Sequence, residues 1–280
     1  MIDDIKNMRK LMETTVDIAV AAGEEILDVY HNGFDVESKD DGSPLTTADR
    51  RAHELIVKRL GELSPVWPIL SEESASIDYA QRSAWQRFWL VDPLDGTKEF
   101  IKRNGEFTVN IALVDDGVPV LGVVHTPAQK VSHAAAQGGG AYLINESGEY
   151  KPISAKKYSN DEVTMVASRS HAGAAVNAYR EKLERQMGKV NIQSMGSALK
   201  ICLVAEGKAD IYPRLGLTSE WDTAAAHCVL NIAGGKLVNC NGEPLAYNKE
   251  NILNPWFFAI GDASFDWVGV MDLSEFDPII

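Results

Sequence analysis

Hydrophobic residues recur at helical spacing along the first sixty positions of the chain. Over residues 8–30 they form one stripe, which predicts a long amphipathic helix. A second helix is predicted from about Thr47 to Leu60, with Thr46 or Thr47 as its N-cap. The loop 38–44 between them is rich in Gly, Ser, Asp and Pro. The stripe of the first helix consists of Met8, Leu11, Met12, Ile18, Ala19, Ala22, Ile26 and Tyr30.

From residue 66 to residue 144 the pattern changes to short apolar runs that indicate β-strands. Two of these runs are joined by Asp115-Asp116-Gly117, a sequence typical of a β-hairpin turn. The first half is therefore predicted to pack helices against a largely antiparallel sheet. The expected strands are Val66–Leu70, Phe88–Val91, Val109–Val114, Val118–Val124, Val131–Gln137 and Ala141–Ile144.

The second half alternates strands and helices, which indicates an α/β layer. We expect a boundary near residues 145–160, with an α+β subdomain over 1–150 and an α/β subdomain over 151–280. Strands are expected at Val163–Ala167, Val190–Ser194, Ala209–Tyr212 and Lys236–Asn239. Helices are expected at Ala172–Met187, Ser197–Glu206 and Trp221–Ala233.

Composition limits the classes of partner. The chain has 280 residues, 45% of them hydrophobic, and a formal net charge of −13. Such a surface repels a nucleic-acid polymer, and a small anionic substrate would need local cations or a metal. No apolar run is long enough to span a membrane, and the N-terminus lacks a signal-peptide pattern. The three scattered cysteines favour reduced thiols, so a cytoplasmic location is expected.

Carboxylates gather where predicted strands end. Asp92-Pro93-Leu94-Asp95-Gly96-Thr97 follows the run Phe88–Val91, and Pro93 is expected to help end that strand. Gly96 and Thr97 open a predicted helix whose free N–H groups suit a phosphate oxygen. Glu72 follows another strand and Asp222 begins a helix. Carboxylates at such positions are typical of Mg²⁺ sites.

Structural roles explain each carboxylate equally well when it is taken alone. An acidic residue after a strand is usually part of a solvated turn, and Asp222 alone is better explained as a helix cap. From spacing alone, a metal site and an ordinary turn therefore stay open as alternatives.

Three separated motifs, in this order, resemble the signatures of the inositol monophosphatase superfamily: Glu72-Glu73-Ser74, Trp89–Thr97 and Trp221–Ala225. The string Asp92–Asn110 is similar to that of bacterial 3'(2'),5'-bisphosphate nucleotidases of the CysQ type. The similarity extends from the first helix to about residue 260. It implies a layered αβαβα sugar-phosphatase fold, dependence on two or three Mg²⁺ ions and inhibition by Li⁺.

The resemblance also implies roles for individual residues. The metal ligands would be Glu72, Asp92, Asp95, Asp222 and the main-chain carbonyl of Leu94, with Asp92 bridging two ions. Thr97 and Asp49 would orient and deprotonate the attacking water. The amides of Gly96 and Thr97 would hold the phosphate. Substrate contacts of the nucleotidase branch would fall on His171, Ser197, Lys200 and Arg214, with Arg169 a weaker candidate.

The implied reaction is hydrolysis of adenosine 3',5'-bisphosphate to AMP and phosphate, with the 3'-phospho sulfate donor as another substrate, in support of sulfate assimilation. An inositol monophosphatase, a sugar-bisphosphate phosphatase and a non-catalytic nucleotide- or metal-binding protein remain alternatives. A monomer and a dimer both stay open, as does peripheral attachment to the inner membrane face. The tail over residues 262–280 could dock on the body, mediate self-association or stay loose.

Overall fold

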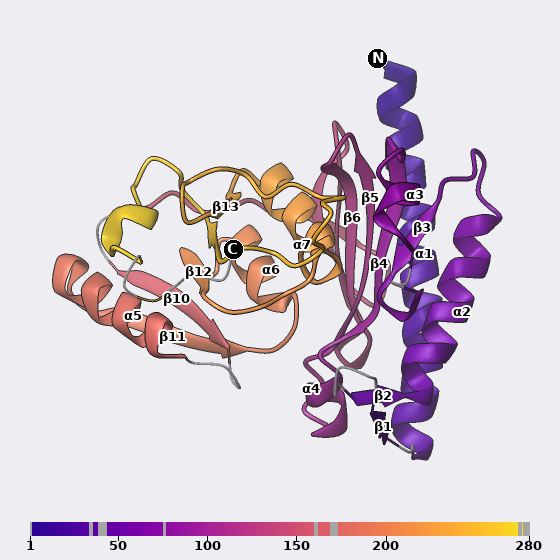
Figure 1. Ribbon diagram of the computed structural model, residues 1–280, viewed down its shortest axis with the longest axis horizontal. Helices are drawn as coiled ribbons and strands as arrows, with labels where there is room; N and C mark the ends of the chain where they lie inside the picture. Colours follow the sequence, from indigo (N-terminus) through magenta and orange to yellow (C-terminus); the bar gives the residue numbers. More distant parts are fainter. Residues whose placement is uncertain are drawn as a thin grey trace.

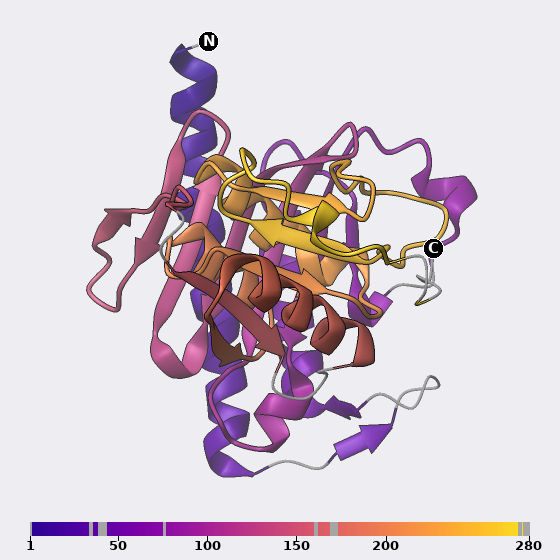
Figure 2. The same cartoon turned by 90° about the vertical axis from the view of Figure 1, so that its left-hand side faces the viewer.

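Five layers of helices and sheets make up the protein (Figure 1). The computed structural model describes residues 2–33, 36–38, 44–74, 77–159, 162–168, 173–273 and 276. In Figure 1, helices α1 (Ile2–Asn32) and α2 (Thr47–Gly61) form one outer layer, and a seven-stranded sheet follows. Helices α6 (Leu199–Ala205) and α7 (Glu220–Ile232) come next, then a five-stranded sheet, and α5 (Ala174–Met187) lies on the other outside. Figure 2 looks onto the side that carries α5. The predicted αβαβα layering is confirmed.

The outer helices α1 (Ile2–Asn32) and α2 (Thr47–Gly61) pack side by side on the first sheet. Helix α2 begins at Thr46, whose hydroxyl accepts a hydrogen bond from the N–H of Ala48 at 3.2 Å. The predicted cap is therefore confirmed. A short hairpin of β1 (Val36–Ser38) and β2 (Pro44–Thr46) connects the two helices.

The first sheet has the strand order β3-β4-β5-β6-β7-β8-β9, and only β3 runs parallel to its neighbour. The predicted hairpin is present. Asp116 and Gly117 form its two-residue loop with φ of 48° and 75°, the left-handed conformation that such loops need. Strand β9 was not expected. The bounds are β3 Ile69–Ser71, β4 Arg87–Asp95, β5 Thr108–Asp115, β6 Val118–Thr126, β7 Val131–Ala136, β8 Gly140–Ile144 and β9 Tyr150–Pro152.

Strand β4 corrects one expectation. We expected Pro93 to help end this strand after Val91, but β4 continues to Asp95. Its register against β5 shifts between Asp92 and Asp95, so Pro93 lies at an irregularity where no ladder hydrogen bond is required of it. Asp92 and Asp95 therefore both belong to strand β4, and Asp95 is its last residue.

The second sheet is mixed, with the order β11-β10-β12-β14-β13. Strand β10 pairs in parallel with β11 and β12, whereas β14 runs antiparallel to β12 and β13. Strand β14 was not expected. The strands are β10 Val163–Ser168, β11 Val190–Met195, β12 Ile211–Arg214, β13 Lys236–Asn239 and β14 Phe257–Ile260. The three predicted helices are present as α5 Ala174–Met187, α6 Leu199–Ala205 and α7 Glu220–Ile232.

Helix α7 lies between the two sheets and packs tightly on the first one. A Cβ placed on Gly122 of β6 would lie 2.2 Å from the carbonyl oxygen of Ala225, so only glycine permits this approach. One hydrophobic cluster contains residues of both sheets and of α6 and α7. Whether residues 1–150 and 151–280 are separate folding units stays a prediction.

The described part of the C-terminal tail docks on the body of the protein. Trp267 is 1% exposed, its Nε1–H donates to the carbonyl of Asp262 at 2.8 Å, and its own carbonyl accepts from the hydroxyl of Tyr179 at 2.7 Å. Leu273 is buried in the same cluster as α5. Within the described residues, no helix is both long and apolar enough to cross a membrane.

Candidate active site

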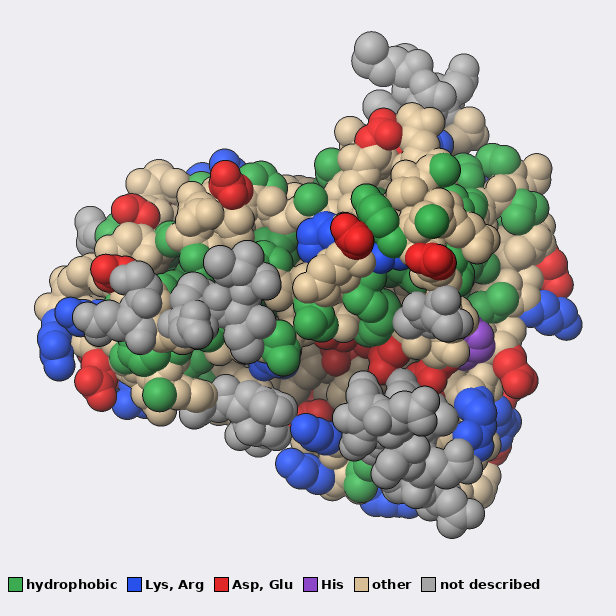
Figure 3. Space-filling view, in the orientation of Figure 1, with side chains coloured by type: hydrophobic (Ala, Val, Ile, Leu, Met, Phe, Trp, Pro, Cys, Tyr) green, Lys and Arg blue, Asp and Glu red, His purple; other side chains and the backbone are tan. Residues whose placement is uncertain are grey.

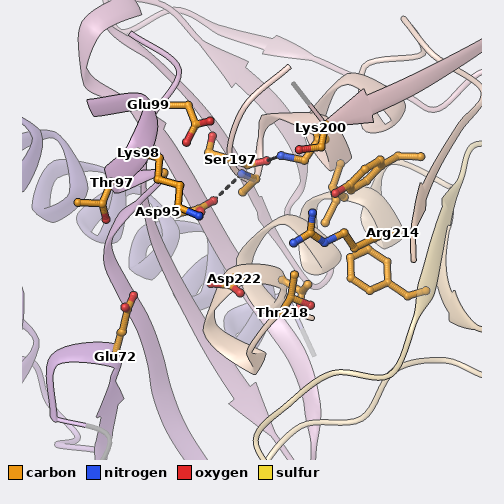
Figure 4. A pocket seen from close by; sticks show the side chains of 17 residues that line it. Glu72, Asp95, Thr97, Lys98, Glu99, Ser197, Lys200, Arg214, Thr218 and Asp222 are labelled. Carbon is orange, nitrogen blue, oxygen red and sulfur yellow. Dashed lines mark hydrogen bonds between the residues drawn. The ribbon is translucent and has the colours of Figure 1, made fainter. Parts of the chain in front are cut away.

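A cavity of about 240 Å³ lies where the two halves of the chain meet. Its walls come from the end of β4, from α4 (Thr97–Ile101), from the starts of α6 and α7, and from the end of β12 (Figure 4). In Figure 3 acidic side chains gather in a hollow near the centre of one face of the molecule. The cavity therefore depends on segments more than a hundred residues apart.

Three carboxylates converge at one end of this region. One oxygen atom each from Asp92, Asp95 and Asp222 lies within 4.8 Å of the others. Asp92 is almost fully buried, whereas Asp95 and Asp222 are half-buried and line the cavity. The structure thus brings together residues from β4 and from the first turn of α7.

Glu72 faces these three carboxylates from another wall. It begins the short 3-10 turn Glu72–Ser74 that follows β3, and its side chain points toward the cavity (Figure 4). Its charge acts on all three aspartates, since it raises the pKa of each. Glu72 belongs to the same acidic region but lies outside the compact group of three.

Backbone N–H groups hold Asp92 and Asp222 in place. The N–H of Leu94 donates to Asp92 Oδ1 at 3.0 Å, and the N–H of Ser219 donates to Asp222 Oδ2 at 2.7 Å. The second bond belongs to a capping box at the start of α7. Asp222 therefore caps helix α7 and also belongs to the acidic group. The sequence had left these two roles open as alternatives.

The electrostatics of the group favour a cation. Burial and the charges of Glu72, Asp95, Asp222 and Asp49 raise the pKa of Asp92 well above its usual range. Burial, followed by the charge of Asp95, raises the pKa of Asp222 to about 7. A divalent ion would relieve this repulsion, and carboxylate oxygens are the hard ligands that Mg²⁺ prefers. The residues present therefore fit a divalent cation.

The predicted catalytic pair lies next to this group. Asp49 is 2% exposed at the start of α2, where its Oδ2 accepts from the N–H and the hydroxyl of Thr46 at 2.8 and 2.6 Å. Thr97 lines the cavity, and its hydroxyl donates to the carbonyl of Leu94 at 3.4 Å. Joint action of Thr97 and Asp49 on a water stays a prediction.

Two basic side chains line the opposite end of the cavity. Lys200 donates from Nζ to the carbonyl of Ser197 at 2.6 Å and lies 5.6 Å from the ring centroid of Tyr212. Burial lowers the pKa of Lys200 to about 8, although the charge of Asp95 opposes this shift. Arg214 donates to the carbonyl of Leu217 at 2.8 Å. Lys98 and Glu99 line the cavity as well, and Lys98 lies beside Asp95 (Figure 4). The aspartates nevertheless gather toward one end of the cavity, and Lys200 and Arg214 toward the other, so we call these the acidic end and the basic end.

Of the remaining predicted site residues, some line the cavity and others lie outside the described part of the chain. Gly96 lines the cavity with a φ of 89°, a left-handed conformation that favours glycine, and it forms the N-cap of α4. Ser197 also lines the cavity. Arg169 and His171 lie outside the described residues, so their roles stay predictions.

Two buried polar residues next to the site were not found from the sequence. Glu106 accepts a hydrogen bond from the N–H of Gly196 at 2.8 Å. Asn110 is 1% exposed and pairs with Asp92 across the strands, and within the described part of the chain its amide atoms have no hydrogen-bond partner. An asparagine between the apolar residues Val109 and Ile111 was the available signal for the second.

Comparisons with known proteins agree with this geometry. Residues 7–256 match the model of the inositol monophosphatase family. The 3'(2'),5'-bisphosphate nucleotidase CysQ of Escherichia coli strain K12 is 47% identical over 250 residues, which cover 88% of this chain and 98% of that protein. The corresponding protein of Buchnera aphidicola is 40% identical over 263 residues, or 92% and 96% of the two chains.

A solved structure shows the same fold. The crystal structure of CysQ from Bacteroides thetaiotaomicron, a bacterial member of the inositol monophosphatase family, superposes with a TM-score of 0.80 at 45% identity. The match covers 90% of this chain and 97% of that one. Sequence and fold therefore agree that the chain belongs to the inositol monophosphatase family.

Proposed function

We propose that this protein is a Mg²⁺-dependent phosphatase that hydrolyses the 3'-phosphate of adenosine 3',5'-bisphosphate to give AMP and phosphate. The observation that carries the proposal is the cavity with two chemically opposite ends. Asp92, Asp95 and Asp222 converge within 4.8 Å at one end, and Lys200 and Arg214 line the other. The relatives named as 3'(2'),5'-bisphosphate nucleotidases support the substrate class.

A bisphosphate nucleotide fits this polarity. The scissile phosphate would lie at the acidic end, where metal ions held by the carboxylates would reverse the local charge. The second phosphate would lie near Lys200 and Arg214, because a point charge and a planar guanidinium both bind phosphate oxygens. This arrangement also explains how a chain with a net charge of −13 could bind an anion.

Several groups of the chain would hold the divalent ions: the carboxylates of Glu72, Asp92, Asp95 and Asp222, and the carbonyl of Leu94. Bound Mg²⁺ supplies a Lewis acid that neutralises phosphoryl charge and makes water more acidic. The burial of Asp92 keeps water away from its carboxylate, which strengthens the electrostatic interactions of that group.

The remaining residues would act on the water and the phosphate. Thr97 would orient the attacking water, and Asp49 would accept the proton through the threonine hydroxyl. The N–H groups of Gly96 and Thr97 would hold the phosphate in line. As the water oxygen bonds to phosphorus, the bond to the 3'-oxygen breaks and the departing 3'-oxygen takes up a proton. No covalent phosphoenzyme is needed.

A phosphate-release assay tests the proposal. Adenosine 3',5'-bisphosphate, the 3'-phospho sulfate donor, inositol 1-phosphate and fructose 1,6-bisphosphate are compared at one Mg²⁺ concentration, with and without EDTA. We expect the highest kcat/KM for the adenosine bisphosphate and no release with EDTA. Equal or faster turnover of inositol phosphate would instead favour an inositol monophosphatase. Ligand-induced stabilisation without phosphate release would favour a binding protein.

The cellular setting forms part of the same proposal. Removing the 3'-phosphate would recycle the nucleotide by-product of sulfate assimilation. We place this activity in the cytoplasm, with the protein as a monomer or a dimer. Li⁺ is expected to inhibit phosphate release, which the same assay measures when LiCl replaces an equal concentration of NaCl.

A further inference from the structure

The turn 196–198 belongs to the second half of the chain, but residues of the first half hold its backbone. The N–H of Gly196 donates to Glu106 Oε2 at 2.8 Å, and the N–H of Ala198 donates to Asp95 Oδ2 at 2.6 Å. Both contacts join residues at least 90 positions apart. Charged acceptors make these hydrogen bonds stronger than bonds between neutral groups.

The turn has a conformation that needs such support. Ser197 has a φ of 46°, which lies in the left-handed region that residues with a Cβ seldom adopt. A conformation of this kind persists only where the surrounding structure holds it, and it is common next to functional sites. Two carboxylates hold the backbone on either side of Ser197.

Close packing shows that the turn lies directly on Glu106. A Cβ placed on Gly196 would lie 2.8 Å from the carbonyl oxygen of Glu106 and 2.9 Å from Cγ of Glu99. Glu106 is itself 8% exposed, and its N–H donates to the side-chain oxygen of Asn104 at 2.9 Å. The carboxylate of Glu106 is therefore a fixed support beneath the turn.

The turn carries the basic end of the cavity. Ser197 lines the cavity, and the ammonium group of Lys200, three residues further, donates to the carbonyl of Ser197 at 2.6 Å. A shift of the turn would move both groups relative to the acidic end. Under the proposed function, this distance would determine where the second phosphate of the nucleotide lies.

We propose that Glu106 is a positioning residue for substrate recognition: its carboxylate fixes the turn 196–198 and thereby places Ser197 and Lys200 for the nucleotide. This inference rests on the proposed function. Glu106 is the suitable residue to test, because the other support, Asp95, belongs to the acidic group. Changing Glu106 leaves every proposed metal ligand in place.

The test compares two substrates and a product. Glu106→Ala should raise KM for adenosine 3',5'-bisphosphate about tenfold with kcat changed less than about twofold, since a charge-assisted hydrogen bond is lost away from the reacting atoms. KM for p-nitrophenyl phosphate, which has no nucleoside and no second phosphate, should change less than about twofold. Calorimetry should show about tenfold weaker binding of AMP.

Two further variants separate positioning from folding. Glu106→Gln retains an oxygen acceptor and should restore most of the wild-type KM. Glu106→Asp withdraws the carboxylate by about 1.5 Å and should behave like Glu106→Ala, so it carries the test if the alanine variant does not fold.

Asp210→Ala is the matched control. Asp210 is a buried carboxylate that accepts from the N–H of Thr164 at 2.7 Å, and it does not line the cavity. This control should lower thermal stability but leave both KM values unchanged.

Wild-type KM values in both Glu106→Ala and Glu106→Asp would overturn the inference. A Gln variant as impaired as the alanine variant would overturn it too, as would an equal rise in KM for both substrates. Failure of the proposed function has a different signature, because the wild-type protein itself would then release no phosphate from the nucleotide.

Discussion

The carboxylate of Asp95 accepts a hydrogen bond from the backbone N–H of Ala198, with an Oδ2–N distance of 2.6 Å. Asp95 ends strand β4 in the first half, and Ala198 precedes helix α6 in the second. The same carboxylate belongs to the acidic group with Asp92 and Asp222. One side chain therefore links the proposed metal site to the turn that carries the basic end of the cavity.

Asp95→Asn separates these two contacts. The amide oxygen can still accept from Ala198, but the negative charge at the acidic group is lost. We expect phosphate release to fall about a hundredfold or more, because loss of a charged ligand weakens metal binding and charge stabilisation together. Asp116→Asn, in the β5–β6 turn, is the control and should keep wild-type activity. A variant with most of the wild-type rate would contradict a metal role for Asp95.

Asp92→Asn should change stability in opposite directions with and without metal. In EDTA the variant should melt at a higher temperature than the wild type, since burial and four neighbouring carboxylates destabilise the Asp92 charge. Mg²⁺ at a hundred times its Kd should stabilise the wild type by about 2.7 kcal/mol. The variant should respond much less. Differential scanning fluorimetry measures all four melting temperatures, and equal Mg²⁺ responses would count against the proposed site.

The contact between His133 and Glu206, outside the site, predicts that the stability of the folded protein depends on pH. Their side chains form a buried ion pair with an Nε2–Oε1 distance of 2.9 Å. Burial lowers the pKa of His133, but Cys202 and Glu206 outweigh it and raise the pKa to about 10. Because the folded pKa exceeds the unfolded value, the pair stabilises the protein fully below about pH 6.5 and loses this effect as pH rises through about 10.

Urea unfolding at several pH values checks this prediction. His133→Gln should lower the free energy of unfolding relative to wild type at about pH 6, and the difference should shrink towards about pH 10. His31→Gln, which changes an exposed histidine, is the control and should change the free energy of unfolding by less than about 0.5 kcal/mol. A constant difference across the pH range would show that His133 is neutral in the folded protein.

Trp267→Ala tests the docking of the C-terminal segment. The indole is 1% exposed and hydrogen-bonded, so its removal should lower the free energy of unfolding by about 3–5 kcal/mol. Trp267 does not line the cavity, and kcat per folded molecule should stay the same. Val66→Ala, at a side chain 68% exposed, should change stability by less than about 0.5 kcal/mol. A stable Trp267→Ala protein would indicate a loosely attached segment.

Local patterns in the sequence predicted much of the fold. The apolar stripe of α1, the cap at Thr46 and the turn Asp116-Gly117 each depend on residues close together in the chain, and each is present. Strand β14 was missed because its pairing partners, β12 and β13, are fixed by sheet topology and not by a local period. The prediction that Pro93 ends β4 was wrong because a register shift against β5 accommodates the proline, and this shift also depends on the pairing of strands.

Part of the site could likewise be predicted from the sequence, and part could not. Asp92, Asp95 and Asp222 were expected to be neighbours because of motifs that resemble a known family, and they converge in the structure. Glu106 lies within the string Asp92–Asn110 that resembles the same family, but the resemblance assigns it no role. Its partner, Gly196, lies 90 residues away, so no spacing in the sequence connects the two. Only the packing of one half on the other reveals this contact.

That packing makes the segment between β9 and β10 a natural place to divide the gene. A break there would leave Asp92 and Asp95 on one polypeptide and Asp222 on the other. Neither fragment alone would hold the acidic group, so phosphate release would appear only after the fragments associate. The protein could then serve as a split reporter, in which catalysis records the meeting of two fused partners.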